Sequence, residues 1–444
     1  MTAPIALHHT MRWAALALHR VAQGRATHQA LATVPAPLRP ATQALLFHAL
    51  RHWGSTRAMV GLLTAGRIKP KLEQLLCVAL ALLDRPEQGV KYDAHTVVNQ
   101  AVAACKHDPQ WRAASGLVNA CLRRYGREQA QLRQAIARDE QAQHNHPQWW
   151  LARLQSQYPQ HWQAIVAADL QAAPMVLRVN TRHHARNAYR DLLQQQGMVS
   201  EPVGEDGLIL LQAMAVERLP GFEKGWVSVQ DASAQQAARL IWQSPLLQDW
   251  RAAEAPRILD ACSAPGGKTA HILELGAAEV TALDLDADRL ERVSETLHRL
   301  GLRAQLCVAD AAQAGEWQSG GPWDAIVLDA PCSASGIVRR HPDVLWLRRE
   351  TDLDALMQTQ KRLLHALWPQ LRSGGRMVYA TCSIFKEEGQ DQVAAFVASH
   401  PDAVWQASPG HLLPARVSDA SSLGLSHNAA MAYDGFYYAV LDKR

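Results

Sequence analysis

Two cysteine motifs that follow apolar runs constrain the fold of this chain more than any other feature. Asp329-Ala330-Pro331-Cys332-Ser333 follows the apolar run 325–328, and Thr381-Cys382-Ser383 follows the run 377–380. Such runs, separated by a helical segment, are typical of parallel strands in an α/β sheet. Ligands of these sheets bind just beyond the carboxyl ends of the strands. We therefore expect two thiols and one carboxylate to converge at a catalytic rim.

The same alternation of strand and helix continues through the C-terminal half of the chain. Strands are predicted over 257–261, 280–285, 304–309, 325–328 and 377–380, and helices between them over 287–300 and 352–371. Alternating strands and helices indicate a doubly wound, mostly parallel sheet. The sequence therefore predicts an α/β fold of the Rossmann-like type for the catalytic part.

The N-terminal third is predicted to be all helix and is strongly basic. Apolar residues recur at helical spacing in 14–21, 41–53, 72–83 and 97–104, with breaks at 35–40, 86–89 and 108–109, and the segment 116–124 is expected to be an apolar helix ending in two arginines. Residues 1–144 hold 18 Lys and Arg against 8 Asp and Glu, a balance of +10. Such a balance is expected of a nucleic-acid-binding module, although a solvated helical surface or a protein-interaction bundle is the alternative.

A smaller mixed α/β unit is predicted between these two parts. A linker over 144–147 precedes a helical stretch over 149–170, and a strand at 176–180, a helix at 187–196 and a strand at 207–211 follow. The sequence therefore predicts three domains: an all-helical domain over 1–140, a small α/β subdomain over 141–232 and the catalytic domain over 233–444.

The cysteine count and the hydropathy bear on the cellular compartment. The chain has seven cysteines, an odd number, no C-x-x-C pair and no secretory signal, so we expect a reducing cytoplasm and no zinc site. No apolar run reaches the roughly 18 residues that a membrane span needs. We expect Cys77, Cys105, Cys121 and Cys307 to be small buried hydrophobic residues.

A glycine-containing loop follows the first predicted strand of the catalytic part. Asp260-Ala261-Cys262-Ser263-Ala264-Pro265-Gly266-Gly267-Lys268-Thr269 leads into a helix, whose amino end offers free N–H groups. Its spacing is neither G-x-G-x-x-G nor that of a P-loop. Asp284 and Asp310 end the next two strands, placed for ribose hydroxyls and an adenine edge. Acids at successive strand ends suit a nucleoside, although any one of them alone is better explained as a helix cap or turn residue.

Together these motifs resemble a known family. D-A-C-S-A-P-G-G-K-T, D-A-P-C-S-A-S-G, the following R-R-H-P-D, and A-T-C-S are similar to those of bacterial 16S ribosomal RNA (cytosine-C5)-methyltransferases of the RsmB (Sun/Fmu) type. The helical N-terminus resembles the antitermination factor NusB. L-R-V-N-T and V-Q-D-A-S resemble the family's RNA-binding subdomain, and D-G-F-Y-Y-A resembles its closing strand.

The resemblance implies a cofactor, a substrate and a set of site residues. It implies S-adenosylmethionine bound by Cys262, Ser263, Ala264, Pro265, Gly266, Gly267, Lys268, Asp284, Asp310 and Asp329. It also implies Cys382 as the nucleophile, Cys332 as the residue that assists elimination, Asp329 at the cytosine edge, and Lys268 beside the base or the carboxylate. The expected partner is 16S ribosomal RNA, with no metal and no membrane, bound by a monomer.

Other readings of the same motifs stay open at this point. The catalytic motifs alone also permit a tRNA or DNA cytosine methyltransferase, and a non-catalytic RNA-binding or antitermination protein is the alternative outside enzymes. Cys332 and Cys382 are expected to be reactive rather than structural, since small polar residues flank both. Arg339, Arg340 and His341 are expected either to contact phosphates or to cap a surface loop.

Overall fold

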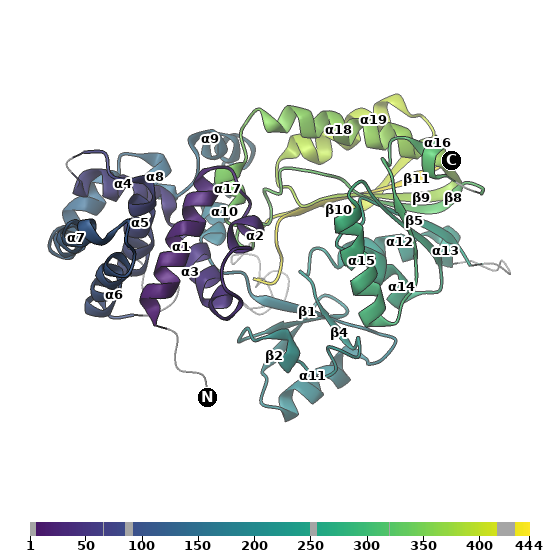
Figure 1. Cartoon of the computed structure of the whole chain (residues 1–444). Coiled ribbons are helices and arrows are strands. Elements are labelled where there is room, and N and C mark those ends of the chain that lie inside the picture. Colours follow the sequence, from purple (N-terminus) through teal and green to yellow (C-terminus); the bar gives the residue numbers. More distant parts are fainter. Residues whose placement is uncertain (1–5, 65, 85–91, 249–254, 319, 415–430) are drawn as a thin grey trace. The chain divides into compact units, whose positions relative to one another are not determined.

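The computed structural model describes residues 6–64, 66–84, 92–248, 255–318, 320–414 and 431–444. Contacts divide the chain into two units, Met1–Ala172 with Val338–Glu350 and Ala173–Ile337 with Thr351–Arg444 (Figure 1). Within the described ranges, every helix is too short or too polar to cross a lipid bilayer. The three-part division at residues 140 and 232 is finer than this one and stays a prediction.

The first unit is helical, as its sequence predicts. Its helices are α1 (Leu7–Ala22), α2 (Thr27–Leu31), α3 (Arg39–Arg51), α4 (Trp53–Leu63), α5 (Pro70–Asp84), α6 (Ala94–Lys106), α7 (Ser115–Ile136), α8 (Glu140–His144), α9 (Gln148–Gln157), α10 (Trp162–Asp169) and α17 (Val344–Leu347). Every residue from Leu75 to Leu82 of α5 is buried, so this helix forms the centre of the core on all its sides. A helix that is apolar all round is typical of such a central position.

Three local expectations for this unit are corrected by the structure. The helix expected to end at the arginine pair Arg123-Arg124 continues to Ile136, with a kink at Glu128. The stretch 149–170 divides into α9 and α10. The expected linker is not a free connection, since Asn145 and His146 are buried. Asn145 adopts a left-handed φ of 54°, and its side chain accepts a hydrogen bond from Ser55 N at 2.8 Å. The break expected at 86–89 lies outside the described residues. The helix before it, α5, ends at Asp84.

A segment that follows the first cysteine motif belongs to the helical unit. Residues 338–350, which include α17, pack among its helices. The Trp346 ring lies 5.3 Å from that of Trp53, and Trp346 Nε1 donates to Leu50 O at 3.0 Å. The carbonyl of Arg339 accepts from Arg51 Nη2 at 2.6 Å, and Arg339 is fully buried. Arg339 is therefore a core residue and no part of a surface loop, whereas Arg340 is half-buried and His341 is exposed.

The second unit contains the predicted doubly wound sheet. Its strands are β5 (Arg257–Ala261), β6 (Glu279–Asp284), β7 (Gln305–Val308), β8 (Trp323–Asp329), β9 (Leu371–Thr381), β10 (Ala403–Leu412) and β11 (Phe436–Lys443), in the order β10-β11-β9-β8-β5-β6-β7. The five strands from β9 to β7 are parallel, and β11 and β10 are antiparallel to their neighbours. All five predicted strands are present, while β10 was not predicted.

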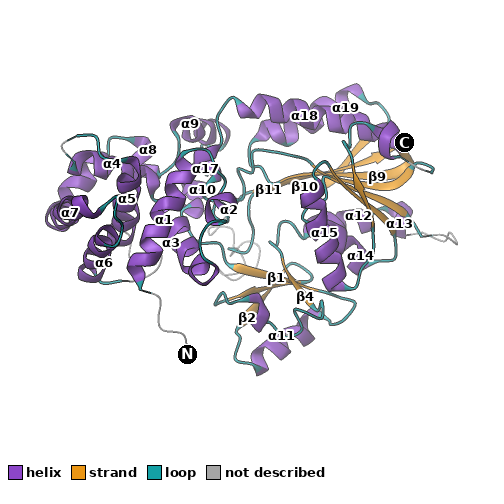
Figure 2. Cartoon of the chain, in the orientation of Figure 1, coloured by secondary structure: helices purple, strands orange, loops and turns teal. Residues whose placement is uncertain are grey.

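Helices cover both faces of this sheet (Figure 2). One layer consists of α12 (Gln236–Trp242), α14 (Gly267–Leu275) and α15 (Ala287–Leu300), the other of α18 (Asp352–Leu367) and α19 (Gln390–Ser399), with the short α13 (Pro245–Gln248) and α16 (Ala314–Trp317) beside them. Alternate side chains of β8 pack against the two helix layers. Ala325 and Val327 pack in the cluster with α12 and α14, and Ile326 and Leu328 pack in the cluster with α18 and α19. Burial on both faces explains why this strand is apolar throughout.

A small antiparallel sheet belongs to the same unit. It consists of β1 (Met175–Val179), β2 (Ser200–Val203), β3 (Gly207–Leu210) and β4 (Val227–Val229), in the order β2-β3-β1-β4, with α11 (Arg186–Gln195) packed beside it. Arg178 of β1 forms a buried two-pronged ion pair with Glu274 of α14, at 2.8 and 2.7 Å. Arg178 Nη1 also donates to Gly267 O at 2.9 Å. Arg178 thus fastens the small sheet to both ends of α14, the helix that follows the glycine loop.

Replacing Arg178 with leucine is expected to destabilise the second unit by about 3–5 kcal/mol, because Glu274 is then a buried carboxylate without its partner. Chemical denaturation followed by tryptophan fluorescence measures the loss. The matched control is Arg190→Ala, since the Arg190–Asp191 pair is exposed and 3.5 Å long, and such pairs contribute about 0–1 kcal/mol. Equal stability losses in the two variants would show that the buried pair does not fasten the small sheet.

Candidate active site

The parallel pairing of β8 with β9 brings the two cysteine motifs together. Asp329 lies opposite Ala380 in the register, and Ala330 N donates to Ala380 O at 2.9 Å just past the strand ends. The Cys332 and Cys382 sulfur atoms are 3.4 Å apart. The structure thus places both thiols at one rim of the sheet, as the parallel arrangement of their strands led us to expect.

The two thiols have different surroundings. Cys332 is buried, whereas Cys382 is half-buried and more accessible. The hydrogen bond to Cys382 and burial raise the pKa of the Cys332 thiol well above its ordinary value, and the nearby Glu388 carboxylate adds to this. The Cys332 thiol therefore stays protonated at neutral pH. Since thiolate is the nucleophilic form of cysteine, this argues against Cys332 as the attacking group, and Cys382 is the more accessible of the two thiols.

A lysine and a carboxylate stand at the same rim. Lys268 Nζ, from the first turn of α14, donates to Asp329 Oδ2 at 2.5 Å. Burial by itself lowers the pKa of Lys268, but the attraction of Asp329 and Asp260 outweighs burial and raises it. Asp260 lies fully buried below this pair, and burial raises its pKa to about 7 although Thr269 Oγ1 donates to it at 2.5 Å. The rim thus holds a charged Lys268–Asp329 pair above a carboxyl group that titrates near neutrality.

The loop between β5 and α14 has the backbone geometry of a ligand cradle. Cys262 and Gly266 both have positive φ angles, of 61° and 95°. A side chain at Gly266 would meet Val293, because a Cβ there would lie 3.0 Å from Val293 Cγ1 and 3.1 Å from its Cα. Ser263 Oγ and Asp260 Oδ1 are buried and have no hydrogen-bond partner among the described residues. Because buried polar groups are normally hydrogen-bonded, these two atoms are candidates for hydrogen bonds to a bound ligand.

Cys262 is the third cysteine near the rim, and its surroundings argue against a nucleophilic function. Burial, with the neighbouring acids Asp329, Asp284 and Asp260 adding to it, raises the pKa of Cys262 to about 12. Its thiol therefore stays protonated at neutral pH.

The two predicted nucleoside acids lie at the ends of β6 and just after β7. Asp284 is buried and accepts hydrogen bonds from Ala264 N at 3.1 Å and Asp286 N at 3.2 Å. Asp310 accepts from Ala312 N at 3.0 Å and pairs with Arg362 Nη1 at 2.8 Å. Burial alone raises the pKa of Asp310, but these donors lower it below its ordinary value. Asp310 is therefore held as a carboxylate and shares one oxygen with the Arg362 guanidinium.

Two apolar residues beside these acids were missed by sequence reasoning. Leu285, directly after Asp284, is 73% exposed, and Val308, at the end of β7, is 55% exposed. Exposed apolar side chains next to a strand-end acid offer a surface on which a flat ring can lie. Leu285 follows Asp284 and Val308 precedes Asp310 by two residues, and in the sequence both look like ordinary core positions of a strand. With the cradle and the acids, these residues fit a nucleoside-bearing cofactor.

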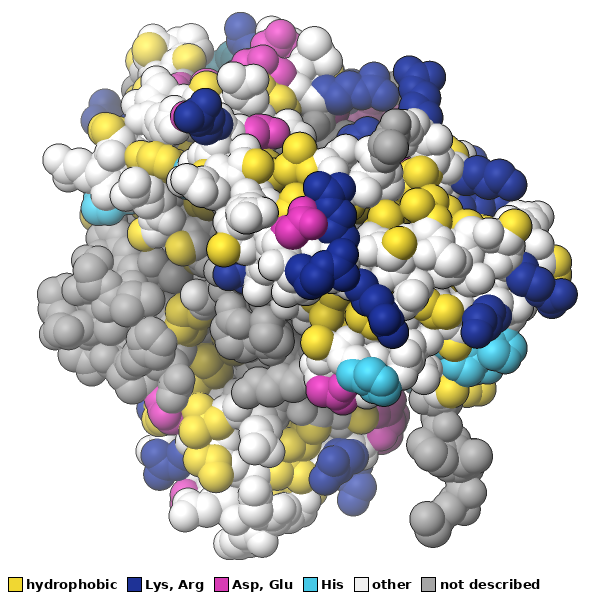
Figure 3. Space-filling view, turned by 90° about the vertical axis from the view of Figure 1, so that its left-hand side faces the viewer, with side chains coloured by type: hydrophobic (Ala, Val, Ile, Leu, Met, Phe, Trp, Pro, Cys, Tyr) yellow, Lys and Arg dark blue, Asp and Glu magenta, His cyan; other side chains and the backbone are white. Residues whose placement is uncertain are grey.

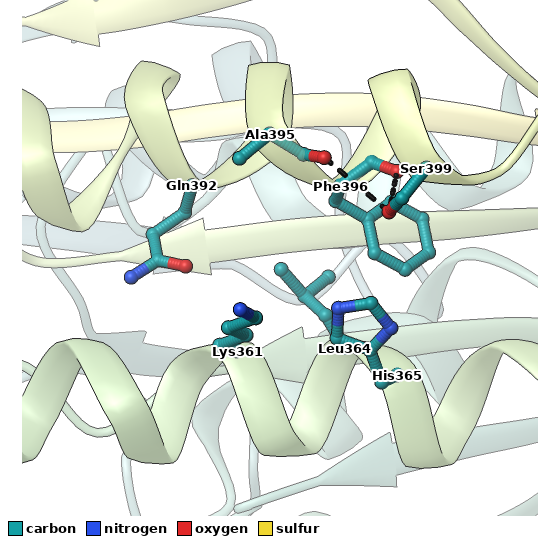
Figure 4. A pocket seen from close by; sticks show the side chains of 7 residues that line it. All are labelled: Lys361, Leu364, His365, Gln392, Ala395, Phe396 and Ser399. Atoms are coloured by element: carbon teal, nitrogen blue, oxygen red, sulfur yellow. Dashed lines mark hydrogen bonds between the residues drawn. The ribbon is translucent and has the colours of Figure 1, made fainter.

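A pocket of the same unit lies away from the catalytic rim. A pocket of about 250 Å³ between α18 and α19 is lined by Lys361, Leu364, His365, Gln392, Ala395, Phe396 and Ser399 (Figure 4). None of the residues predicted for catalysis or cofactor binding lines it. Among the described residues, no group of three or more His, Cys, Asp or Glu side chains is arranged to hold a metal ion.

Known proteins match both the sequence and the fold. Residues 250–442 match the family described as 16S rRNA methyltransferase RsmB/F, and residues 146–217 match the RsmF/B-like ferredoxin-like domain. The chain is 41% identical to "Ribosomal RNA small subunit methyltransferase B" of Vibrio cholerae, over 97% of this chain and 96% of that protein. These matches cover the described catalytic rim and almost the whole of the chain.

Solved structures show the same fold at lower identity. The crystal structure of PH0851 superposes with a TM-score of 0.72 at 19% identity and covers 100% of both chains. A methyltransferase homolog from Pyrococcus horikoshii superposes with a TM-score of 0.55 at 24% identity, over 69% of this chain and 98% of that one. The Rossmann-like methyltransferase fold after an N-terminal helical part is thereby confirmed. With its sequence matches, the chain belongs to the RsmB/F family of 16S rRNA methyltransferases, RNA-modifying enzymes that use S-adenosylmethionine.

Proposed function

We propose that this enzyme methylates carbon 5 of one cytosine in 16S ribosomal RNA through a covalent bond between Cys382 and carbon 6. The observation that carries the proposal is the pair of thiols 3.4 Å apart, beside the Lys268–Asp329 ion pair. The substrate follows from the function named for the Vibrio cholerae relative, whose similarity extends through the helical unit. Because the proposed substrate is ribosomal RNA, we also propose that the enzyme is cytoplasmic.

Cytosine needs activation before it can accept a methyl group at carbon 5. When the Cys382 thiolate adds to carbon 6, the ring becomes an enamine-like nucleophile, and one difficult step is divided into two easier ones. Asp329, supported by Lys268, lies where it can hold the N3 edge of the ring and take up the charge that develops there. S-adenosylmethionine, when bound, supplies an electrophilic methyl group, and Asp284 and the loop 262–267 are the residues that would hold it.

The second thiol is needed for release of the product. After methyl transfer, carbon 5 still carries its proton, and the bond between Cys382 and carbon 6 breaks only when that proton leaves. A water molecule that Cys332 holds takes the proton, because the raised pKa keeps the Cys332 thiol itself protonated. The electron pair left at carbon 5 restores the ring double bond as the Cys382 thiolate departs.

The two cysteines are distinguished by what each variant accumulates. Cys382→Ala is expected to be inactive and free of adduct, since carbon 6 then receives no nucleophile. Cys332→Ala is expected to trap a protein–RNA adduct with an already methylated base, because only elimination is blocked. Denaturing electrophoresis with labelled 16S ribosomal RNA measures both results.

The control for this pair is Cys307→Ala, which removes a half-buried thiol of β7 and should leave activity unchanged. If the adduct instead appeared with Cys382→Ala and vanished with Cys332→Ala, Cys332 would be the nucleophile. Full activity in both variants would rule out covalent catalysis in this chain.

Asp284→Ala is expected to weaken S-adenosylmethionine binding, because the loss of charge-assisted hydrogen bonds costs roughly 1.5–3 kcal/mol. Isothermal titration calorimetry measures the change in Kd. Asp288→Ala is the control, since Asp288 lies four residues away in the first turn of α15 and is exposed. Unchanged affinity in a folded Asp284→Ala variant would contradict the assignment of this carboxylate to the cofactor.

The helical unit offers a surface for the RNA backbone. Lys and Arg side chains form a band across the centre of the face in Figure 3. On α7, Arg123 and Arg127 are exposed and one turn apart, so both project from the same side of the helix. Truncation at residue 140 is a poor test of this surface, because it would strip Trp346 of its packing partner Trp53.

The double substitution Arg123→Ala with Arg127→Ala is therefore expected to weaken binding of 16S ribosomal RNA and to reduce the slope of log K against log salt by about 1–2, as loss of two phosphate contacts does. Filter binding at several salt concentrations measures both quantities. Arg303→Ala is the control, since this exposed arginine precedes β7 at the sheet edge opposite the catalytic rim. An unchanged salt slope in the double variant would remove this face of α7 from RNA binding.

A further inference from the structure

A fully buried carboxylate lies directly behind the two cysteine motifs. Glu388 ends the short 3-10 turn Lys386–Glu388, which follows β9, and none of its surface is exposed. Removing a carboxylate from water costs several kcal/mol unless hydrogen bonds replace the lost solvation. The sequence analysis gave no function to this residue, and the chemistry at the rim does not use it directly.

Four donors surround this carboxylate, and three of them come from the residues that follow the cysteines. Glu388 Oε1 accepts from Ser333 N at 2.8 Å, and Glu388 Oε2 accepts from Ser333 Oγ at 2.5 Å and from Ser383 Oγ at 2.6 Å. Ser333 comes directly after Cys332, and Ser383 comes directly after Cys382. One carboxylate therefore binds both Cys-Ser dipeptides.

The fourth donor links the same carboxylate to the helix layer. Gln360 Nε2 of α18 donates to Glu388 Oε1 at 3.1 Å and to Pro331 O at 3.0 Å. Pro331 immediately precedes Cys332, so this loop is held on both sides of its thiol. Bonds to an ionised acceptor are roughly twice as strong as bonds between neutral groups, which makes the carboxylate a firm anchor.

The Ser335 hydroxyl extends this network and also joins the two cysteine loops. Ser335 Oγ lies 2.9 Å from Ser383 Oγ and accepts from Ile384 N at 2.9 Å. The left-handed φ of 62° at Ala334 turns the first loop back so that Ser333 and Ser335 reach the second. The network is buried throughout, and its members are hydrogen-bonded apart from Gln360 Oε1, which has no partner among the described residues. A buried polar network of this kind makes the loops that it joins rigid.

We propose that Glu388 is a positioning residue of the active site, which binds Ser333 and Ser383 together and thereby holds the two thiols close enough to act on one cytosine ring. The inference rests on the proposed covalent mechanism and deepens it. Attack at carbon 6 and proton removal at carbon 5 take place on neighbouring atoms, so the thiols must stay close together throughout the reaction. A misplacement of about 1 Å costs on the order of 100-fold in rate.

The test is Glu388→Gln, which keeps the size of the side chain but removes its charge and replaces one acceptor with a donor. Methyl transfer to 16S ribosomal RNA is expected to fall by about 10- to 100-fold in kcat, with the KM for RNA and the Kd for S-adenosylmethionine unchanged. Glu387→Gln, at the half-buried neighbouring position, is the matched control and should retain the activity of the unaltered enzyme.

A second measurement reports the placement of the thiols without any methyl transfer. Diamide oxidises two nearby thiols to a disulfide and is itself reduced to the hydrazine, taking up the two protons and two electrons. We expect it to link Cys332 with Cys382 rapidly in the unaltered enzyme, and at least several-fold more slowly in Glu388→Gln. Peptide mass mapping identifies the pair among the seven cysteines. If the unaltered enzyme transfers no methyl group but the substitution still slows this disulfide, the positioning holds and the proposed reaction fails.

Two results would overturn the proposal. In the first, Glu388→Gln keeps both its kcat and its rate of disulfide formation. In the second, kcat falls together with cofactor affinity and melting temperature while disulfide formation stays fast, which describes a residue that only stabilises the fold. Should Glu388→Gln fail to fold, Ser383→Ala removes one donor and leaves Glu388 bound to Ser333 and Gln360. It is then expected to lower kcat and slow the disulfide, and an unaltered rate of both would overturn the proposal equally.

Discussion

Between β8 and β9, the hydrogen bonds of a parallel ladder fix Asp329 opposite Ala380, and everything at the catalytic rim depends on that register. Cys332 and Cys382 follow these positions by three and two residues, which brings their sulfur atoms within 3.4 Å. The register is strongly specified, because both faces of β8 are buried and a slip by one residue would exchange them. The core of the domain thus determines the distance between two reactive groups.

Other contacts bring the remaining parts to that rim. The Lys268–Asp329 pair joins the helix after the glycine loop to the end of β8, so the cofactor cradle and the cysteine loops share one ion pair. Arg178 in turn fastens the small sheet to the same helix through Glu274. Glu388 joins the two cysteine loops by accepting hydrogen bonds from Ser333 and Ser383, the residues that follow the cysteines. The chemistry thus rests on two ion pairs and on one fully buried carboxylate that accepts several hydrogen bonds.

Much of this could be predicted from the sequence, because local patterns carry it. Apolar runs marked all five parallel strands, and the rule that ligands bind at strand ends placed Cys332, Cys382 and Asp329 together. Glu388 could not be found in this way, since nothing in Lys386-Glu387-Glu388 shows which of the two acids is buried. Likewise, β10 contains a proline and a glycine that weaken its signal. The packing of Trp346 against Trp53 joins residues almost 300 positions apart, beyond the reach of any periodicity.

Transfer of a labelled methyl group from S-adenosylmethionine to unmodified 16S ribosomal RNA, followed by mapping of the modified base, tests the account most directly. We expect label at carbon 5 of a single cytosine, and tRNA given as the alternative substrate should stay unlabelled. Label at another atom of the base would contradict the chemistry assigned to the two thiols. Label in tRNA with none in 16S ribosomal RNA would contradict the substrate.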